Sequence, residues 1–235
     1  MSAGKTTVKS RNLFTKVKTA KSRKASSASW LQRHFNDPYV IQSKRDGYRS
    51  RAAYKLLEID EKFKLLKKNA VVLDLGAAPG SWAQVALNKD VMKVIGVDLL
   101  PIDPMYKAEF IIGDFSDDTT VDQIKTLLGE GKITLILSDM APNTSGHKTV
   151  DHIKIVALCE AVFEFAKENL AEGGALVMKL FQGGADGELL QGIKMHFSSI
   201  KHFKPESSRK ASAETYLVAL GFKSSPKCNK KENPS

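Results

Sequence analysis

The sequence is poor in residues that stabilise small secreted proteins, and it has no segment suited to a membrane. Only two of its 235 residues are cysteines, and neither Cys159, in an apolar helical pattern, nor Cys228, in a polar tail, suggests a disulfide framework. No apolar run is long enough to cross a bilayer, and no hydrophobic segment typical of a secretory signal lies near the N-terminus. We therefore expect a protein of a reducing compartment that has no membrane segment.

Acidic residues are absent from the first 36 positions. Residues 1–51 carry 13 of the 36 lysines and arginines and only two acids, so this segment accounts for the net charge of +10. A concentrated basic segment is typical of contact with nucleic-acid phosphates, and Trp30, Phe35, Tyr39 and Tyr48 within it suit stacking on unpaired bases. A solubilising tail, or a mitochondrial transit peptide rich in Ser and Thr, remains an alternative.

Strand and helix patterns alternate along the rest of the chain, which is typical of a mostly parallel sheet covered by helices on both faces. The last two strands are too close in sequence for a crossover helix, so we expect them to pair antiparallel. The pattern predicts an α/β, Rossmann-like fold with seven strands over residues 29–223, between a basic flexible arm at 1–28 and a polar tail at 224–235. The expected strands are 71–75, 93–98, 109–112, 133–138, 174–180, 199–204 and 214–221, and the expected helices are 30–35, 51–63, 81–88, 117–128, 150–170 and 186–197.

The turn after the first strand lacks the glycines of a dinucleotide site. The stretch Asp74-Leu-Gly-Ala-Ala-Pro-Gly-Ser-Trp82 leads from a strand into a helix, where α/β proteins bring backbone amides to a nucleotide-like ligand. Counting from Gly76, Ala78 and Ser81 stand where the fingerprint needs glycine. Pro79 has no amide donor, and the turn has no P-loop lysine. A ligand without phosphates, such as S-adenosylmethionine, fits this turn, and a plain turn without a ligand is the alternative.

Acidic residues end the next two strands. Asp98 lies 24 residues after Asp74, near the ~20-residue spacing of a ribose-binding acid. Asp114 ends the third strand and suits the exocyclic amine of an adenine. Each residue alone is more often a cap or turn former. Two such acids in succession after a glycine turn predict a binding crevice.

Four more residues stand out by their positions. Asp139 closes the fourth strand, at the sheet edge where ligands of α/β proteins bind. Lys179 interrupts an apolar strand, which is unfavourable unless the lysine is paired or near the strand end. Glu214 begins the last strand, and Lys55 lies on the helix before the first strand. Taken singly, the lysines can be solvated or snorkelling side chains and the acids structural caps.

Together these four residues resemble, in order and local context, the K-D-K-E tetrad of the FtsJ-type RNA 2′-O-ribose methyltransferases. The likeness covers roughly residues 28–223, and it is strongest with the bacterial enzymes that methylate a uridine 2′-hydroxyl in large-subunit ribosomal RNA. Ser81 departs from the pattern, because the family usually has a second glycine before the tryptophan. The matching segments are Ser50–Lys55, Asp74–Trp82, Ser138–Pro142, Lys179–Gly183 and Pro205–Glu214.

The resemblance implies a class I methyltransferase that uses S-adenosylmethionine. Lys179 is expected to contact the 2′-oxygen as base or positioning donor, and Lys55 to stabilise negative charge or hold the nucleotide. The implied catalytic residues are Lys179, Asp139, Lys55 and Glu214, and the implied cofactor-binding residues are Gly80, Trp82, Asp98, Asp114 and Asp139. Arg209, Lys210, Arg49 and Arg51 are expected to contact RNA, with ordinary exposed side chains as the alternative.

We therefore expect methylation of a uridine in 23S ribosomal RNA within the assembling large subunit. The expected enzyme is a monomer of the bacterial cytoplasm that needs no metal ion. Mitochondrial large ribosomal RNA or tRNA are alternative substrates, with the mitochondrial matrix as the alternative location. A non-catalytic RNA-binding assembly factor is an alternative of another class, but a scaffold has no need of Lys179 in an apolar strand.

Overall fold

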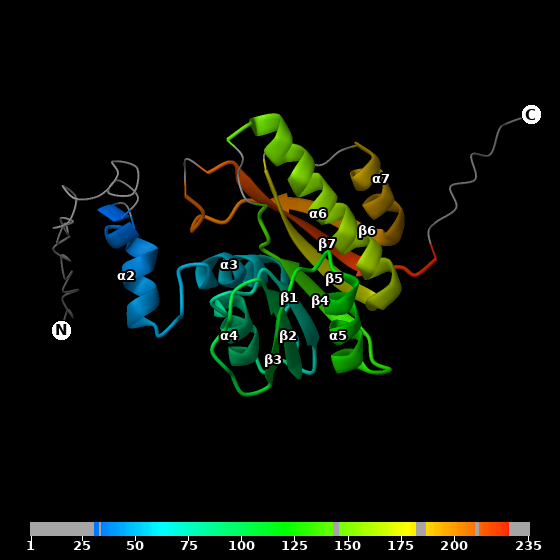
Figure 1. Cartoon of the computed structure of the whole chain (residues 1–235), viewed down its shortest axis with the longest axis horizontal. Coiled ribbons are helices and arrows are strands. Elements are labelled where there is room, and N and C mark those ends of the chain that lie inside the picture. The colour runs from blue at the N-terminus through cyan, green and yellow to red at the C-terminus, as the bar shows by residue number, and fades with distance from the viewer. Residues whose placement is uncertain (1–30, 33, 143–145, 182–186, 210–211, 226–235) are drawn as a thin grey trace, which may run out of the picture. The chain divides into compact units, whose positions relative to one another are not determined.

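The computed structural model describes residues 31–32, 34–142, 146–181, 187–209 and 212–225 (Figure 1). The chain divides into two compact units, Met1–Gly47 and Tyr48–Ser235. The arm expected at 1–28 lies outside the described residues, so its flexibility and the expected domain limits remain predictions. In the first unit, the described residues between 31 and 35 are helical, in agreement with the helix expected there.

The first unit also contains a helix that the sequence analysis missed, α2 (Pro38–Arg45). Asp37 caps it, since its carboxylate accepts a hydrogen bond from the Tyr39 amide at 3.1 Å. Pro38 stands in the first turn, where a missing amide leaves no hydrogen bond unmade. The Asp-Pro pair was thus a helix-start signal, but the helix buries only Val40 and Ser43 and has a weak apolar pattern.

The second unit is built on a seven-stranded sheet in the order β3-β2-β1-β4-β5-β7-β6. The first five strands in this order are parallel, and β7 runs antiparallel to both of its neighbours. This confirms the predicted Rossmann-like class with an antiparallel last strand. The strands are β1 (Val71–Leu75), β2 (Lys93–Asp98), β3 (Ala108–Ile112), β4 (Ile133–Ser138), β5 (Leu170–Phe181), β6 (Phe197–Phe203) and β7 (Glu214–Phe222).

Helices cover both faces of the sheet, α3 and α4 on one and α5, α6 and α7 on the other (Figure 1). Their limits lie within two residues of the expected ones. The strand β5 begins earlier than expected, directly after α6, because it passes through a bulge before its regular pairing with β4. None of the described helices is long and apolar enough to cross a membrane. The helices are α3 (Ala53–Phe63), α4 (Ser81–Asn88), α5 (Asp118–Leu128), α6 (Lys148–Asn169) and α7 (Gly187–His196).

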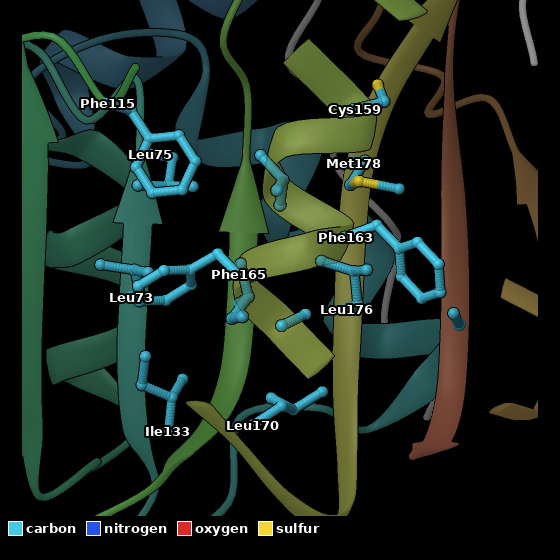
Figure 2. Packing of buried hydrophobic residues seen from close by; sticks show 14 of the residues in the cluster. Leu73, Leu75, Phe115, Ile133, Cys159, Phe163, Phe165, Leu170, Leu176 and Met178 are labelled. Atoms are coloured by element: carbon cyan, nitrogen blue, oxygen red, sulfur yellow. The ribbon is translucent and has the colours of Figure 1, made fainter. Parts of the chain in front are cut away.

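The larger core cluster lies between the sheet and the helices α5, α6 and α7. Figure 2 shows Phe163 and Phe165 of α6 lying over the strand residues Leu73 and Leu176. Phe165 meets Phe115 edge-on, with ring centroids 5.5 Å apart. This packing fixes α6 across the middle strands, next to the carboxyl ends where a ligand of an α/β protein binds.

Strand alternation decides which side chains face α3 and α4. Leu137 of β4 and Val177 of β5 belong to the core cluster under these two helices. Because side chains alternate along a strand, Asp139 and Lys179, two residues further on, face the same helices. Tyr216 of β7 joins them, since it pairs directly with Lys179. These three polar side chains therefore lie on the face of the sheet that α3 and α4 cover, beyond its apolar residues and at the carboxyl end of the parallel strands.

Gly76, at the turn after β1, has a φ of +78°, and a Cβ there would lie 2.9 Å from the main-chain nitrogen of Met140. Gly173 has a φ of +77° with nothing within 4 Å of an added Cβ, so it provides a matched control. We expect Gly173→Ala to lower the free energy of unfolding by about 1–2 kcal/mol, the usual cost of left-handed backbone. We expect Gly76→Ala to lower the free energy of unfolding clearly more, because the main chain at Met140 must move to make room for the added Cβ. Equal costs in urea unfolding would contradict this steric account.

Candidate active site

The four predicted catalytic residues meet at one end of the sheet. The Nζ of Lys179 lies 3.0 Å from Oδ1 of Asp139 and also donates to the main-chain oxygen of that residue. The Nζ of Lys55 lies 3.5 Å from Oδ2 of Asp139 and 2.9 Å from Oε1 of Glu214. Two ammonium groups and two carboxylates thus alternate in the order Lys179, Asp139, Lys55 and Glu214.

Secondary structure brings these residues together from distant parts of the sequence. In the antiparallel pair β5 and β7, Lys179 lies opposite Tyr216 and Phe181 lies opposite Glu214. Helix α3 packs on this face through buried Leu56 and Ile59, which places the neighbouring Lys55 above the strand ends. The tetrad predicted from the sequence is therefore assembled in space, and the role of each member remains a prediction.

The tetrad is mostly shielded from water, since the exposed fraction of its side chains ranges from 9% for Lys179 to 17% for Asp139. Burial alone would raise the pKa of Asp139. The charges of Lys179 and Lys55, together with a hydrogen bond from Tyr216, outweigh burial and hold this pKa below its ordinary value. Asp139 is therefore a carboxylate that compensates both ammonium groups.

Tyr216 is a member of the site that the sequence analysis missed. It is fully buried, and its hydroxyl donates to Oδ1 of Asp139 at 2.7 Å. Burial, together with the charges of Asp139 and Glu214, raises the pKa of Tyr216 well above its usual value, so the hydroxyl stays a donor. Its position two residues after Glu214, on the same face of β7, was the available signal.

Asp74 on β1 faces the same side of the sheet, below the tetrad. It is 1% exposed. Burial, with smaller effects from the charges of Asp139 and Asp98, raises the pKa of Asp74 to about 8. The Ala83 amide opposes this rise, but neither carboxyl oxygen of Asp74 has a hydrogen-bond partner among the described residues. The carboxyl group is thus mostly protonated near neutral pH.

A cavity of about 550 Å³ opens beside the tetrad, beyond the carboxyl ends of the first four strands. The predicted cofactor residues Asp98, Asp114 and Asp139 line it, and Lys154 of α6 lies at its wall without having been singled out from the sequence. Among the described residues, no group of three or more His, Cys, Asp or Glu side chains is placed to hold a metal ion. The carboxylates and apolar side chains that line the cavity suit an organic ligand.

The acids at the carboxyl ends of β2 and β3 accept hydrogen bonds from nearby residues. Asp98 accepts hydrogen bonds from the amides of Ala78 and Leu100, each at 2.9 Å. Asp114 accepts from the amide and the hydroxyl of Ser116 at 2.9 and 2.7 Å, and these bonds lower its pKa. A carboxylate oxygen has two lone pairs, so both side chains can still accept hydroxyl or amine donors from a ligand.

Gly80 and Trp82 do not line this cavity. The Trp82 side chain is 3% exposed, and its Nε1 donates to the Ala52 carbonyl at 2.8 Å. Gly80 is the N-cap of α4 and has a φ of +95°, and a Cβ there would lie 2.7 Å from Nη1 of Arg49. Contact of Trp82 with a cofactor is therefore possible only through its main chain, and both assignments remain predictions.

Ser81, which departs from the usual family pattern, has a defined partner. Its side chain is buried, and its Oγ lies 2.7 Å from Oγ of Ser50. Ser50 also accepts a hydrogen bond from the Ala52 amide through its hydroxyl. A glycine would lack this link, so the hydroxyl pair ties the start of α4 to the turn that precedes α3.

The predicted RNA contacts differ in their surroundings. The Arg49 guanidinium donates to the carbonyls of Pro79 and Asp103 at 3.0 and 2.9 Å, and to that of Pro104 at 3.3 Å. The Arg51 guanidinium donates to the carbonyl of Ser207. Both side chains are thus engaged within the fold.

The remaining predicted RNA contacts lie on the loop between β6 and β7. Arg209 is exposed there, and Lys210 lies outside the described residues. RNA contact by any of the four residues remains a prediction.

Comparison with known proteins identifies the family of this fold and site. The model of the FtsJ-like methyltransferases matches residues 48–222. The chain belongs to the FtsJ-like methyltransferase family. A protein of Granulibacter bethesdensis named ribosomal RNA large subunit methyltransferase E is 51% identical over 225 residues, which cover 95% of this chain and 97% of that protein. A protein of the same name from Rickettsia akari is 50% identical and covers 91% of this chain and 96% of its own length.

A solved structure supports the same assignment. The crystal structure of a ribosomal RNA methyltransferase from Plasmodium falciparum is 36% identical, with a TM-score of 0.67. The match covers 74% of this chain and 98% of that chain. The methyltransferase class predicted from the sequence is therefore confirmed.

Asp74→Asn should alter how stability depends on pH. An unfolded aspartate ionises near its model value of 3.8, whereas Asp74 in the folded protein ionises near 8, so the native state loses stability as the pH rises between these values. Asparagine does not ionise, so this loss should be absent from the variant. We expect the free energy of unfolding of the variant, relative to that of the parent protein, to rise by up to about 1.4 kcal/mol per pH unit in this interval. Denaturant unfolding at pH 5, 6.5 and 8 measures the difference.

Asp122→Asn is the control, because Asp122 is exposed. We expect the free energy of unfolding of this variant to match that of the parent protein at all three pH values. A constant gap between Asp74→Asn and the parent protein would contradict the raised pKa. Asp114 and Asp139 do not affect this comparison. Because their pKa values are lowered, their contributions to stability change with pH only below the tested interval.

Arg49→Ala should weaken binding of S-adenosylmethionine, the donor expected from the sequence. Arg49 ties the glycine turn at Pro79 to the loop after β2 at Asp103 and Pro104. Loss of these charged hydrogen bonds should raise the dissociation constant about threefold to tenfold in calorimetry. Arg209→Ala is the control, with donor affinity unchanged and RNA affinity reduced at fixed salt. Unchanged donor affinity in Arg49→Ala would refute this role of Arg49.

Proposed function

We propose that this protein transfers a methyl group from S-adenosylmethionine to the 2′-hydroxyl of a uridine in 23S ribosomal RNA. The observation that carries the proposal is the Lys179, Asp139, Lys55 and Glu214 tetrad, assembled at the rim of an acidic cavity. The names of the relatives from Granulibacter and Rickettsia support large-subunit ribosomal RNA as the substrate.

The chemistry of the cavity fits the proposed donor. Val97, Leu99 and Phe115 give it apolar walls suited to an adenine ring. Asp98 can accept the two ribose hydroxyls, and Asp114 can accept the exocyclic amine. A cationic donor also suits a cavity whose described acids outnumber its one lysine, Lys154.

The tetrad would hold and activate the acceptor hydroxyl. S-adenosylmethionine, when bound, supplies an activated methyl group on a positively charged sulfur. Lys179 would direct a hydrogen bond at the 2′-oxygen and align it for in-line attack, which provides much of the rate gain. Lys55, held by Asp139 and Glu214, would stabilise the negative charge that develops on this oxygen.

Proton transfer would run through the Lys179 and Asp139 pair. Transfer from the bound donor would form an oxygen–carbon bond and break the donor's carbon–sulfur bond, whose electrons would stay on sulfur. The acceptor oxygen would then have to give up its proton to the protein. Lys179 can take it up while passing one of its own protons to Asp139, whose Oδ1 lies 3.0 Å away. The pair thereby accepts a proton without a free base in the resting site.

Several finer features belong to the same proposal. We propose a monomer that acts in the cytoplasm on the assembling large subunit, where its ribosomal RNA substrate is found. The basic segment 1–51 supports attraction to RNA phosphates. Arg209 and Lys210, on the loop that leads into β7 beside Glu214, would contact RNA near the acceptor.

Lys179→Met should abolish methyl transfer while leaving the fold and the donor site intact. We expect the rate to fall at least about a hundredfold, the usual lower range for loss of a positioned acid or base. The assay supplies methyl-labelled S-adenosylmethionine with naked ribosomal RNA, assembled large subunits or tRNA in separate reactions. Mapping of the labelled ribose identifies the acceptor. Calorimetry with S-adenosylmethionine checks that the variant still binds the donor.

Lys125→Met on the exposed face of α5 is the matched control and should transfer methyl groups at the parent rate. Near-normal transfer by Lys179→Met would refute the role of the tetrad. Labelling of tRNA alone would move the proposal to that substrate. If Lys179→Met restored growth to a deletion strain, the assembly-factor alternative would replace the enzyme.

A further inference from the structure

The loop between β6 and β7, residues 204–213, is fastened to α3 by its main chain. The Glu58 carboxylate accepts hydrogen bonds from the amides of Glu206 and Ser207, at 2.5 and 3.0 Å. The Arg51 guanidinium, just before α3, donates to the carbonyl of Ser207. The loop is thus anchored, through its amides and a carbonyl, to the same helix that carries Lys55.

Two neighbouring serines in this loop are buried but differ in what their hydroxyls do. Ser207 is 0% and Ser208 4% exposed. The Ser207 hydroxyl is buried without a hydrogen-bond partner among the described residues. The Ser208 hydroxyl donates to Oε1 of Glu214 at 2.8 Å, and the same oxygen receives Lys55 at 2.9 Å. Ser208 therefore reaches the tetrad, and Ser207 does not.

The Ser208 hydroxyl limits how Glu214 can be oriented. The terminal torsion of a glutamate is broad, so a single ion pair with Lys55 leaves the carboxylate free to rotate. A second donor on the same oxygen fixes its direction, as an outer contact fixes a functional group in a preorganised site. Lys55 is then held between Glu214 and Asp139 at a set position.

We propose that Ser208 is a positioning residue of the methyl-transfer reaction, acting through Glu214 on Lys55. The loop that carries Ser208 also carries Arg209 and Lys210, the predicted RNA contacts. RNA bound by this loop would therefore lie next to the tetrad. The inference rests on the proposed function for its catalytic consequence. The contact chain itself stands on the geometry alone.

The test compares Ser208→Ala with Ser207→Ala, since each removes one buried hydroxyl from the same loop. In Ser208→Ala, we expect kcat to fall about tenfold to a hundredfold, as for a small misplacement of a catalytic group. KM and the calorimetric affinity for S-adenosylmethionine should stay within twofold of the parent values, about the scatter of such measurements. Ser207→Ala should match the parent protein in kcat, and Ser208→Thr, which keeps the hydroxyl, should recover most of it.

A second measurement is independent of methyl transfer. The amine reactivity of Lys55 toward an acylating reagent, read by peptide mass spectrometry, should rise in Ser208→Ala and stay at the parent level in Ser207→Ala. Unchanged reactivity and kcat in Ser208→Ala would overturn the inference, as would equal losses in both alanine variants. If Lys55 reactivity rises but the parent protein methylates no RNA, the positioning contact stands and the proposed function fails.

Discussion

The carboxylate of Asp139 is the contact on which the active end of the fold depends. Its main-chain amide donates to Leu75 of β1 at 3.0 Å, and its side chain receives Lys179 of β5 and Tyr216 of β7. One residue thus joins β4 to three other strands of the sheet. A charge shielded from water is unfavourable unless it is paired. Asp139 and its two lysines therefore compensate one another, and the loss of either partner would leave an unpaired charge. The charged residues of the tetrad are therefore structurally interdependent.

Much of this arrangement could be predicted, because apolar strands make polar exceptions visible. Asp139 ends one apolar strand and Lys179 interrupts another, and strand alternation then places both on the same face. Glu214 stood out only as the first residue of the last strand, where a structural cap was an alternative. Lys55 carried little signal by itself, since a lysine on an exposed helix is common. It became informative only through the order and context of all four residues.

Other members of the site could not be predicted, because their partners are distant in sequence. Tyr216 reads as one more aromatic residue of a strand, and only the folded sheet brings its hydroxyl to Asp139, 77 residues away. Arg49 was interpreted by its charge, which says nothing of the three carbonyls that it serves. Ser208 and Ser207 are indistinguishable in sequence, and their difference arises from where the loop meets Glu214.

The cavity and the tetrad lie on different sides of the sheet edge, and among the described residues Asp139 alone belongs to both. An in-line transfer needs donor and acceptor on opposite sides of the moving methyl group, so the proposed reaction would take place beside Asp139. A second carboxylate charge beside Asp139 would repel it, because the charge of Asp139 is one of the causes that raise the pKa of Asp74. Asp74 lies just below, yet with a pKa near 8 it is mostly protonated near neutral pH. Because buried Asp74 stays mostly neutral, Asp139 is spared this repulsion near neutral pH.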